Sequence, residues 1–172
     1  MFSKTIFKKF YRTQRHTPVY VSWGDVRSVV VLLHSASSSY QDVLDIVARL
    51  EQDNKTVTTY YLADNKRMDI ACLNSDIRVV TKKDVGCFKK PKSGVVECQG
   101  VYDLVIDLTL GHTLVTDYIV AMHNAKLVCG GADEERLVRY DFQIATDVLP
   151  DKSSSSLLAQ IVKYLSIIQS EK

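Results

Sequence analysis

The chain has 172 residues, of which 46% are hydrophobic and 24% charged, and its formal net charge is +2. This length suits one domain with a substantial core, and the composition is that of an ordinary globular protein. The small net charge argues against a protein that binds nucleic acid through its overall charge. The apolar stretches are too short to cross a membrane, and the N-terminus lacks the apolar run of a secretory signal.

The charge is unevenly distributed along the chain. Residues 1–16 contain five basic side chains and no acidic one, whereas the other 156 residues contain 17 basic and 20 acidic side chains. Apolar residues recur at helical spacing within this segment, at Ile6, Phe7, Phe10 and Tyr11. We therefore predict a basic amphipathic helix over residues 1–16, followed by a single domain over residues 17–172.

Two roles are open for this helix. Its apolar face either packs on the domain, or the helix docks on a partner or on an anionic membrane surface. Membrane contact would be weak and would use the basic side chains, namely Lys4, Lys8, Lys9, Arg12 and Arg15.

The four cysteines are scattered, and none forms a C-x-x-C pair or a His/Cys cluster with zinc-ligand spacing. Free thiols of this kind are typical of a reducing compartment, so we expect a cytoplasmic protein. Cys129 lies in an apolar run and is predicted to be a core residue.

Strand and helix patterns alternate along the chain. Residues 28–33 form a continuous apolar run, which is typical of a strand buried on both faces of a parallel sheet. A helical pattern follows over residues 40–53, and a second strand pattern over residues 56–62, so these segments predict a β-α-β unit.

The second half continues this alternation after a basic, glycine-containing loop or hairpin over residues 82–100. The predicted elements are strands at 77–81, 103–108, 126–130 and 140–146, a helix at 113–123, and a last helix that begins within Ser153–Ser156. The pattern predicts a single Rossmann-like α/β domain, with an open, mostly parallel sheet and helices on both faces.

Several segments resemble a known family. The sequences "TKKDVGCFKKPK" (81–92), "YDLVIDL" (102–108) and "AKLVCGG" (125–131), with the N-terminal arm and the closing helix, resemble a bacterial domain-of-unknown-function family. Its members are short single-domain proteins, and the resemblance covers nearly the whole chain and implies no established activity.

A narrower resemblance covers residues 102–131. These residues are similar to the N-terminal half of heptosyltransferase-like glycosyltransferases, in which such strands frame the acceptor side of the cleft. Those enzymes hold the nucleotide-sugar with a second α/β domain, for which 172 residues leave no room.

Ligands of open α/β sheets lie beyond the carboxyl ends of the strands, where the strand order reverses. This rule selects the loops 34–39 and 109–113. Hydroxyl groups in the first loop precede a helix and suit an anion. The loop contains no glycine and the chain no Walker A motif, so helix capping is the favoured role of these serines.

Polar residues at these loops are the candidate site. Asp107 has two functional roles open to it, orienting His112 or binding a ligand hydroxyl. Its structural roles are capping the next helix or bonding to nearby backbone amides. His34 and His112 approach each other if their strands are neighbours, and Ser35 would complete a Ser-His-Asp set, although the G-x-S-x-G motif is missing.

Gly130 and Gly131 complete the set of candidate ligand-binding residues, because they permit a tight turn with positive φ after a strand. The acids that follow, residues 133–135, either hold a hard cation or form a solvated turn, and the latter is much commoner. We predict no metal site and no cofactor.

Together these features predict a cytoplasmic α/β protein that acts as a non-catalytic binding or interaction module, with a protein partner or a small anionic ligand. The first alternative is a reduced glycosyltransferase-like or nucleotide-using enzyme, whose site requires Asp107 and His112 to face a cleft. The second is a peripheral membrane protein attached by its N-terminal helix. Nucleic acid is disfavoured, because the basic loop has one aromatic residue, Phe88.

Overall fold

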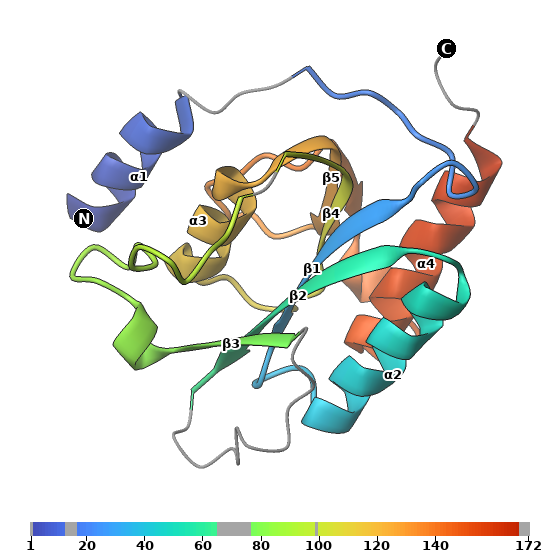
Figure 1. Cartoon of the computed structure of the whole chain (residues 1–172), viewed down its shortest axis with the longest axis horizontal. Coiled ribbons are helices and arrows are strands. Elements are labelled where there is room, and N and C mark those ends of the chain that lie inside the picture. The colour runs from blue at the N-terminus through green and yellow to red at the C-terminus, as the bar shows by residue number, and fades with distance from the viewer. Residues whose placement is uncertain (1, 13–16, 65–76, 99, 169–172) are drawn as a thin grey trace.

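The fold is a six-stranded sheet with helices on both faces, as seen in the computed structural model, which describes residues 2–12, 17–64, 77–98 and 100–168 (Figure 1). The strands are β1 (Ser28–His34), β2 (Thr56–Ala63), β3 (Ile77–Thr81), β4 (Val101–Asp107), β5 (Asn124–Gly131) and β6 (Phe142–Ile144). Their order is β3-β2-β1-β4-β5-β6, and every neighbouring pair is parallel. The predicted Rossmann-like α/β arrangement is confirmed.

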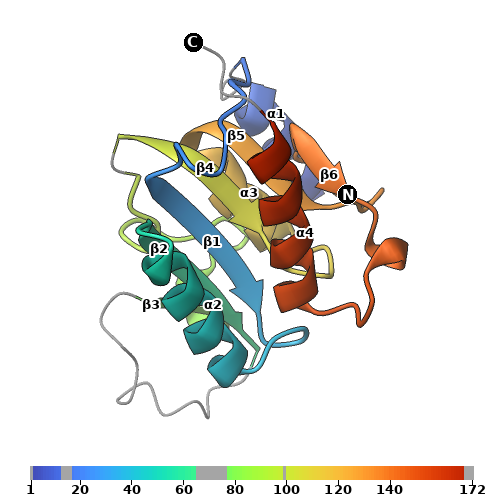
Figure 2. The ribbon, with the colours of Figure 1, turned by 90° about the vertical axis from the view of Figure 1, so that its right-hand side faces the viewer.

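In the described part of the chain, four α-helices accompany the sheet: α1 (Phe2–Arg12), α2 (Tyr40–Gln52), α3 (Leu114–Met122) and α4 (Ser154–Ile167). Short 3-10 helices cover Lys82–Asp84 and Thr146–Val148. Figure 2 shows α2 and α4 side by side on one face of the sheet, with α1 and α3 behind it.

The central strand β1 shows why its apolar run is continuous. Val29, Val31 and Leu33 belong to the core between the sheet and α2 and α4. Val30 and Leu32 belong to the core on the α1 and α3 side. Because successive side chains of a strand point to opposite faces, a strand covered on both sides is apolar at every position.

The strand β6 is shorter than the predicted 140–146. The two residues before it have other roles, since the Tyr140 hydroxyl bonds to Asp107, and Asp141 bonds to the backbone of Val128 through both its N–H and its carboxylate. Farther along β5, Cys129 is fully buried, which confirms that it is a core residue.

The N-terminal helix packs on α3. Phe7 is fully buried, and its ring meets the Tyr118 ring edge-on at a centroid distance of 4.8 Å. At the next turn, the Tyr11 hydroxyl accepts a hydrogen bond from the Arg139 N–H. The apolar face of α1 therefore packs against the rest of the protein.

The Arg12 side chain and Arg15, both predicted to contact a membrane, lie outside what the structure describes. Among the described helices, none is long and apolar enough to span a bilayer.

Asp103 joins β1 and β4 at their amino ends. Its carboxylate accepts hydrogen bonds from the backbone N–H groups of Arg27 (2.8 Å) and Ser28 (3.0 Å) and from Lys126 Nζ (2.7 Å). Burial alone would raise the pKa of Asp103, but these hydrogen bonds outweigh it and hold the pKa below its usual value. The ionised carboxylate therefore stabilises the folded chain.

We expect Asp103→Asn to reduce the amount of unfolding free energy that the protein loses as the pH falls. Because the folded-state pKa lies below the unfolded value of about 3.9, the stabilisation is present above that pH and is lost as the pH falls through the folded-state pKa. Urea denaturation from neutral pH to about pH 2 should show a shallower acid loss of unfolding free energy in the variant than in the wild type. The exposed Asp147→Asn is the control, and parallel curves for wild type and Asp103→Asn would contradict this assignment.

Candidate functional site

The strand order reverses between β1 and β4, which lie side by side in the middle of the sheet. At this point the loop after β1 leads to α2 on one face, and the loop after β4 leads to α3 on the other (Figure 1). The two loops diverge, and a space for a ligand is left between them.

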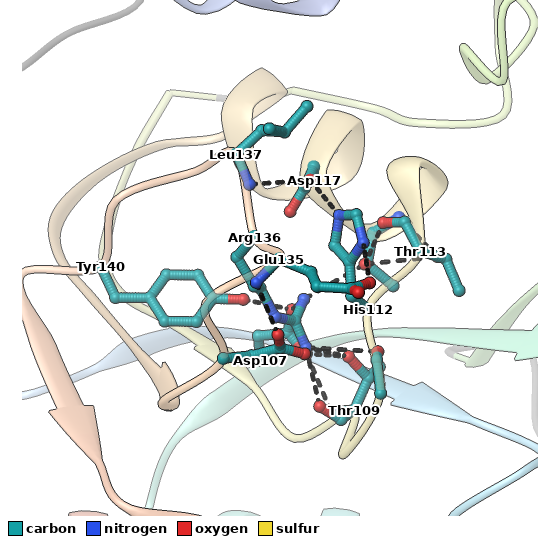
Figure 3. Close-up of polar contacts among 12 residues, drawn as sticks. Asp107, Thr109, His112, Thr113, Asp117, Glu135, Arg136, Leu137 and Tyr140 are labelled. Atoms are coloured by element: carbon teal, nitrogen blue, oxygen red, sulfur yellow. Dashed lines mark hydrogen bonds and ion pairs between the residues drawn. The ribbon is translucent and has the colours of Figure 1, made fainter. Parts of the chain in front are cut away.

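Asp107, the last residue of β4, is fully buried and closed off by hydrogen bonds (Figure 3). Its Oδ1 accepts from the N–H (2.8 Å) and the hydroxyl (2.5 Å) of Thr109. Its Oδ2 accepts from Arg136 Nη1 (2.5 Å) and from the Tyr140 hydroxyl (2.6 Å). The carboxylate is thus saturated by the protein itself, and it stabilises the end of β4.

Arg136 is the partner that sequence reasoning missed. Its side chain is 4% exposed, and Nη2 also donates to the carbonyl and the hydroxyl oxygen of Thr109, both at 2.8 Å. Burial disfavours its charge, but the Asp107 carboxylate raises the pKa of Arg136 above its usual value. Burial and the same carboxylate also raise the pKa of Tyr140, which therefore stays a neutral donor.

His112 is oriented by Asp117, not by Asp107. Its Nε2 lies 2.7 Å from Asp117 Oδ2, which also accepts the backbone N–H of Leu137 at 3.2 Å (Figure 3). Asp117 is fully buried, and this burial raises its pKa, although the hydrogen bond with His112 acts in the opposite direction. With Asp117 ionised, Nε2 carries the hydrogen of a neutral imidazole. The other ring nitrogen, Nδ1, lies 3.9 Å from Glu135 Oε2.

His34 and Ser35 follow β1 at the same edge of the sheet. His34 Nδ1 accepts the N–H of Ala36 (3.0 Å), so the hydrogen of its neutral ring is on Nε2. Ser35 Oγ accepts the N–H of Asp64 (3.1 Å), which ties the serine to the end of β2. The structure thus brings His34 and His112 to one cavity, but it directs Ser35 to another partner.

Two adjoining cavities lie at this edge. The switch-point cavity, of about 520 Å³, is bordered by polar side chains of His34, Ser37, His112 and Lys152. The β1–β3 cavity, of about 370 Å³, extends over the ends of β1, β2 and β3, and its polar lining includes Asp64, Lys82 and Lys89. His34 and Thr113 border both spaces, so we treat the two adjoining cavities together as the candidate site.

The glycine pair does not form the predicted turn. Gly130 and Gly131 are the last residues of β5, and neither has a positive φ. A Cβ on Gly130 would lie 2.5 Å from a carbon of the Tyr140 ring, and one on Gly131 would lie 2.9 Å from a methyl carbon of Thr146. Glycine is required at these two positions because the side chains of Tyr140 and Thr146 pack directly against the backbone.

In the described part of the chain, no cluster of three or more His, Cys, Asp or Glu residues is arranged to hold a metal ion.

Comparison with known proteins identifies a family. A model described as a family of unknown function, DUF6913, matches residues 1–168, so the chain belongs to this family. No curated protein and no solved structure matches the chain significantly. The predicted resemblance to a domain-of-unknown-function family is confirmed, whereas the likeness to glycosyltransferases stays a prediction.

We expect Arg136→Ala to destabilise the protein strongly. The substitution leaves the Asp107 carboxylate buried with no cation beside it, and breaking a buried pair in this way costs about 3–5 kcal/mol. Chemical denaturation measures the loss of unfolding free energy. Arg139→Ala, three residues away and exposed, should change it by less than about 0.5 kcal/mol. Equal effects of the two substitutions would show that the ion pair is dispensable.

Gly130→Ala should also destabilise, by about 1–3 kcal/mol, because the added methyl group displaces the Tyr140 ring. The measurable sign of that displacement is a change in the near-ultraviolet circular dichroism of the tyrosines together with a lower midpoint of denaturation. Gly24→Ala is the matched control, since a Cβ there meets no atom within 4 Å. A Gly130→Ala protein as stable as the wild type would refute the close packing.

Proposed function

We propose that this member of DUF6913 is a non-catalytic binding module that holds a small anionic ligand in the switch-point and β1–β3 cavities. The observation that carries the proposal is the charge of the cavity lining. Among the described residues that border the two spaces there are three lysines, Lys82, Lys89 and Lys152, and one carboxylate, Asp64. The histidines His34 and His112 add donors when they are protonated.

The helix termini at this edge favour an anion near α3. The N-terminus of α2 is closed by a capping box, in which the Ser39 side chain accepts from the N–H of Asp42 and the Asp42 carboxylate accepts from the N–H of Ser39. A negative charge is thus already present at that helix end. At α3, the cap Thr113 and the first helical residues Leu114 and Val115 line the β1–β3 cavity.

The first N–H groups of a helix have no acceptor within the helix, and the helix dipole makes this end positive. An anion in the β1–β3 cavity would therefore lie between the N-terminus of α3 and the ammonium groups of Lys82 and Lys89. The arrangement supports a ligand with one phosphate or carboxylate group. It does not support a dinucleotide, because the loop 34–39 has no glycine that would let the backbone surround a pyrophosphate.

The second candidate function is acid–base catalysis at His112. The supporting observation is the pair of His112 with buried Asp117, at the border of the switch-point cavity. A histidine that is held by a carboxylate through one ring nitrogen can exchange a proton through the other. Asp107 has no part in this candidate, since it is sealed by Arg136 and Tyr140.

Differential scanning fluorimetry with inorganic phosphate, and with mononucleotides and dicarboxylates as further probes, tests the binding function. A ligand that binds only the folded state raises the melting temperature. We expect a rise with at least one monoanionic or dianionic probe, and its loss in Lys82→Ala/Lys89→Ala because the lysines contribute most of the positive charge of the cavity.

The control is Lys163→Ala, which removes an exposed lysine of α4 on the other side of the sheet and should keep the full rise. Anion effects that are equal in the two variants would reflect general salt stabilisation and would contradict the proposal. Absence of any rise with the whole panel would contradict it as well.

A further inference from the structure

We propose that the protein docks on anionic lipid bilayers through a basic surface led by Phe88. We define the basic surface as the outward side of α1 together with residues 82–92. Its described lysine side chains are all exposed, namely Lys4, Lys8, Lys9, Lys82, Lys83, Lys89, Lys90 and Lys92. Lys82 and Lys89 also line the β1–β3 cavity, but the inference does not rest on the ligand proposed there.

The surface is formed by two segments that are far apart in sequence. Lys90 Nζ lies 5.2 Å from the centroid of the Phe10 ring, so residues 82–92 reach α1. Figure 1 shows this loop running beneath α1. The lysines of both segments therefore act on the same region of solvent.

The charge of the chain is strongly polarised by this arrangement. The segments 2–12 and 82–92 together contain nine basic residues and one acidic residue, Asp84. The other residues of the chain contain 13 basic and 19 acidic side chains. The Asp84 carboxylate accepts the N–H and the hydroxyl of Thr81, at 2.8 and 2.7 Å. A molecule with such a distribution is oriented by an anionic surface, because the positive region is attracted and the remainder is repelled.

Phe88 lies at the tip of a tight turn that presents it to solvent. The turn is closed by backbone hydrogen bonds from Gly86 N–H to Lys90 O (2.8 Å) and from Lys89 N–H to Gly86 O (3.1 Å). An antiparallel bridge between Val85 and Pro91 joins its two sides. Phe88 is 45% exposed, and lysines follow it directly. An ordered turn loses little conformational freedom when its apolar tip enters the interfacial region of a bilayer.

A bilayer fits this surface better than a nucleic acid does. The described cations of the surface are all lysines, which attract phosphate as hydrated point charges and lack the planar fork that pairs with it in two hydrogen bonds. Phe88 is the one exposed aromatic side chain there among the described residues, whereas single-stranded nucleic acid is bound on successive stacking rings. Lysines around one apolar tip suit anionic headgroups above an acyl region.

The mode of attachment differs from that of an amphipathic helix lying in the membrane. Phe7 is fully buried against Tyr118, so the apolar face of α1 remains on the protein. The helix contributes charge, and the turn contributes the apolar contact.

Co-sedimentation with vesicles of phosphatidylserine and phosphatidylcholine tests the inference on the full chain. We expect binding at low ionic strength, little binding to pure phosphatidylcholine, and release by salt. Each lysine near an anionic bilayer is worth roughly fivefold in partitioning, so Lys90→Ala/Lys92→Ala should weaken binding roughly 25-fold. Phe88→Ala should weaken it at unchanged charge.

The matched control is Arg49→Ala/Lys163→Ala, which removes two exposed charges from α2 and α4 on the opposite face of the sheet. Binding that falls equally in both double variants, or that is absent for the wild type, would overturn the inference. So would tight binding of a single-stranded oligonucleotide in place of vesicles.

Neither Lys90, Lys92 nor Phe88 lines the two cavities. The response of these variants to phosphate in the thermal assay should therefore equal that of the wild type. Circular dichroism melting of each variant confirms that the fold is intact. Failure of the vesicle experiment would leave the ligand experiment unaffected, and the reverse also holds.

Discussion

The buried pair of Asp107 and Arg136 is the constraint on which the candidate site depends. Asp107 ends β4 at the reversal of strand order, and Arg136 comes from the connection between β5 and β6. By bonding to Asp107 and to Thr109, the guanidinium fixes the start of the loop that leads to α3. The position of Thr113, which borders both cavities, follows from that of this loop.

The connection between β5 and β6 also positions His112. The N–H of Leu137, next to Arg136, bonds to Asp117, and Asp117 bonds to His112. The adjacent residues Arg136 and Leu137 therefore bind both buried carboxylates, Arg136 through its guanidinium and Leu137 through its backbone N–H. The charge of Arg136 also favours the ionised form of Asp117, so one guanidinium reduces the cost of removing both carboxylates from water. Asp107 and Asp117 are thus both bound within the protein, where they stabilise the edge of the sheet. The lysines and His34 border the cavities.

The fold was largely predictable from the sequence because burial on both faces leaves a clear pattern. The runs at residues 29–33 and 104–106 are apolar at successive positions, and the helices between them show one apolar face. The alternation of strands and helices predicted a mostly parallel sheet with helices on both faces, whereas the order of the strands became known only from the structure. Only the ends of elements differed, as at β6, where Tyr140 leaves the strand pattern to reach Asp107.

The site was less predictable, because its decisive contacts join residues with no periodic relation. Asp107 and Arg136 are 29 positions apart, and neither the spacing nor the neighbouring residues mark them as a pair. The glycines were noticed, but a glycine required by an approaching ring looks the same in sequence as one required by a turn. The place of the site could be inferred, since the carboxyl ends of parallel strands meet at one edge, whereas the partners of each side chain required coordinates.

The segment 82–92 shows how one short loop serves two environments. Val85 and Gly86 line the β1–β3 cavity, while Phe88 at the tip of the same turn points away from the core and is exposed. The turn is kept closed by backbone hydrogen bonds and by the Val85–Pro91 bridge, which connect the cavity wall to the exposed tip. Lys82 and Lys89 belong both to the basic surface and to the lining of the β1–β3 cavity, so the two regions share part of their positive charge.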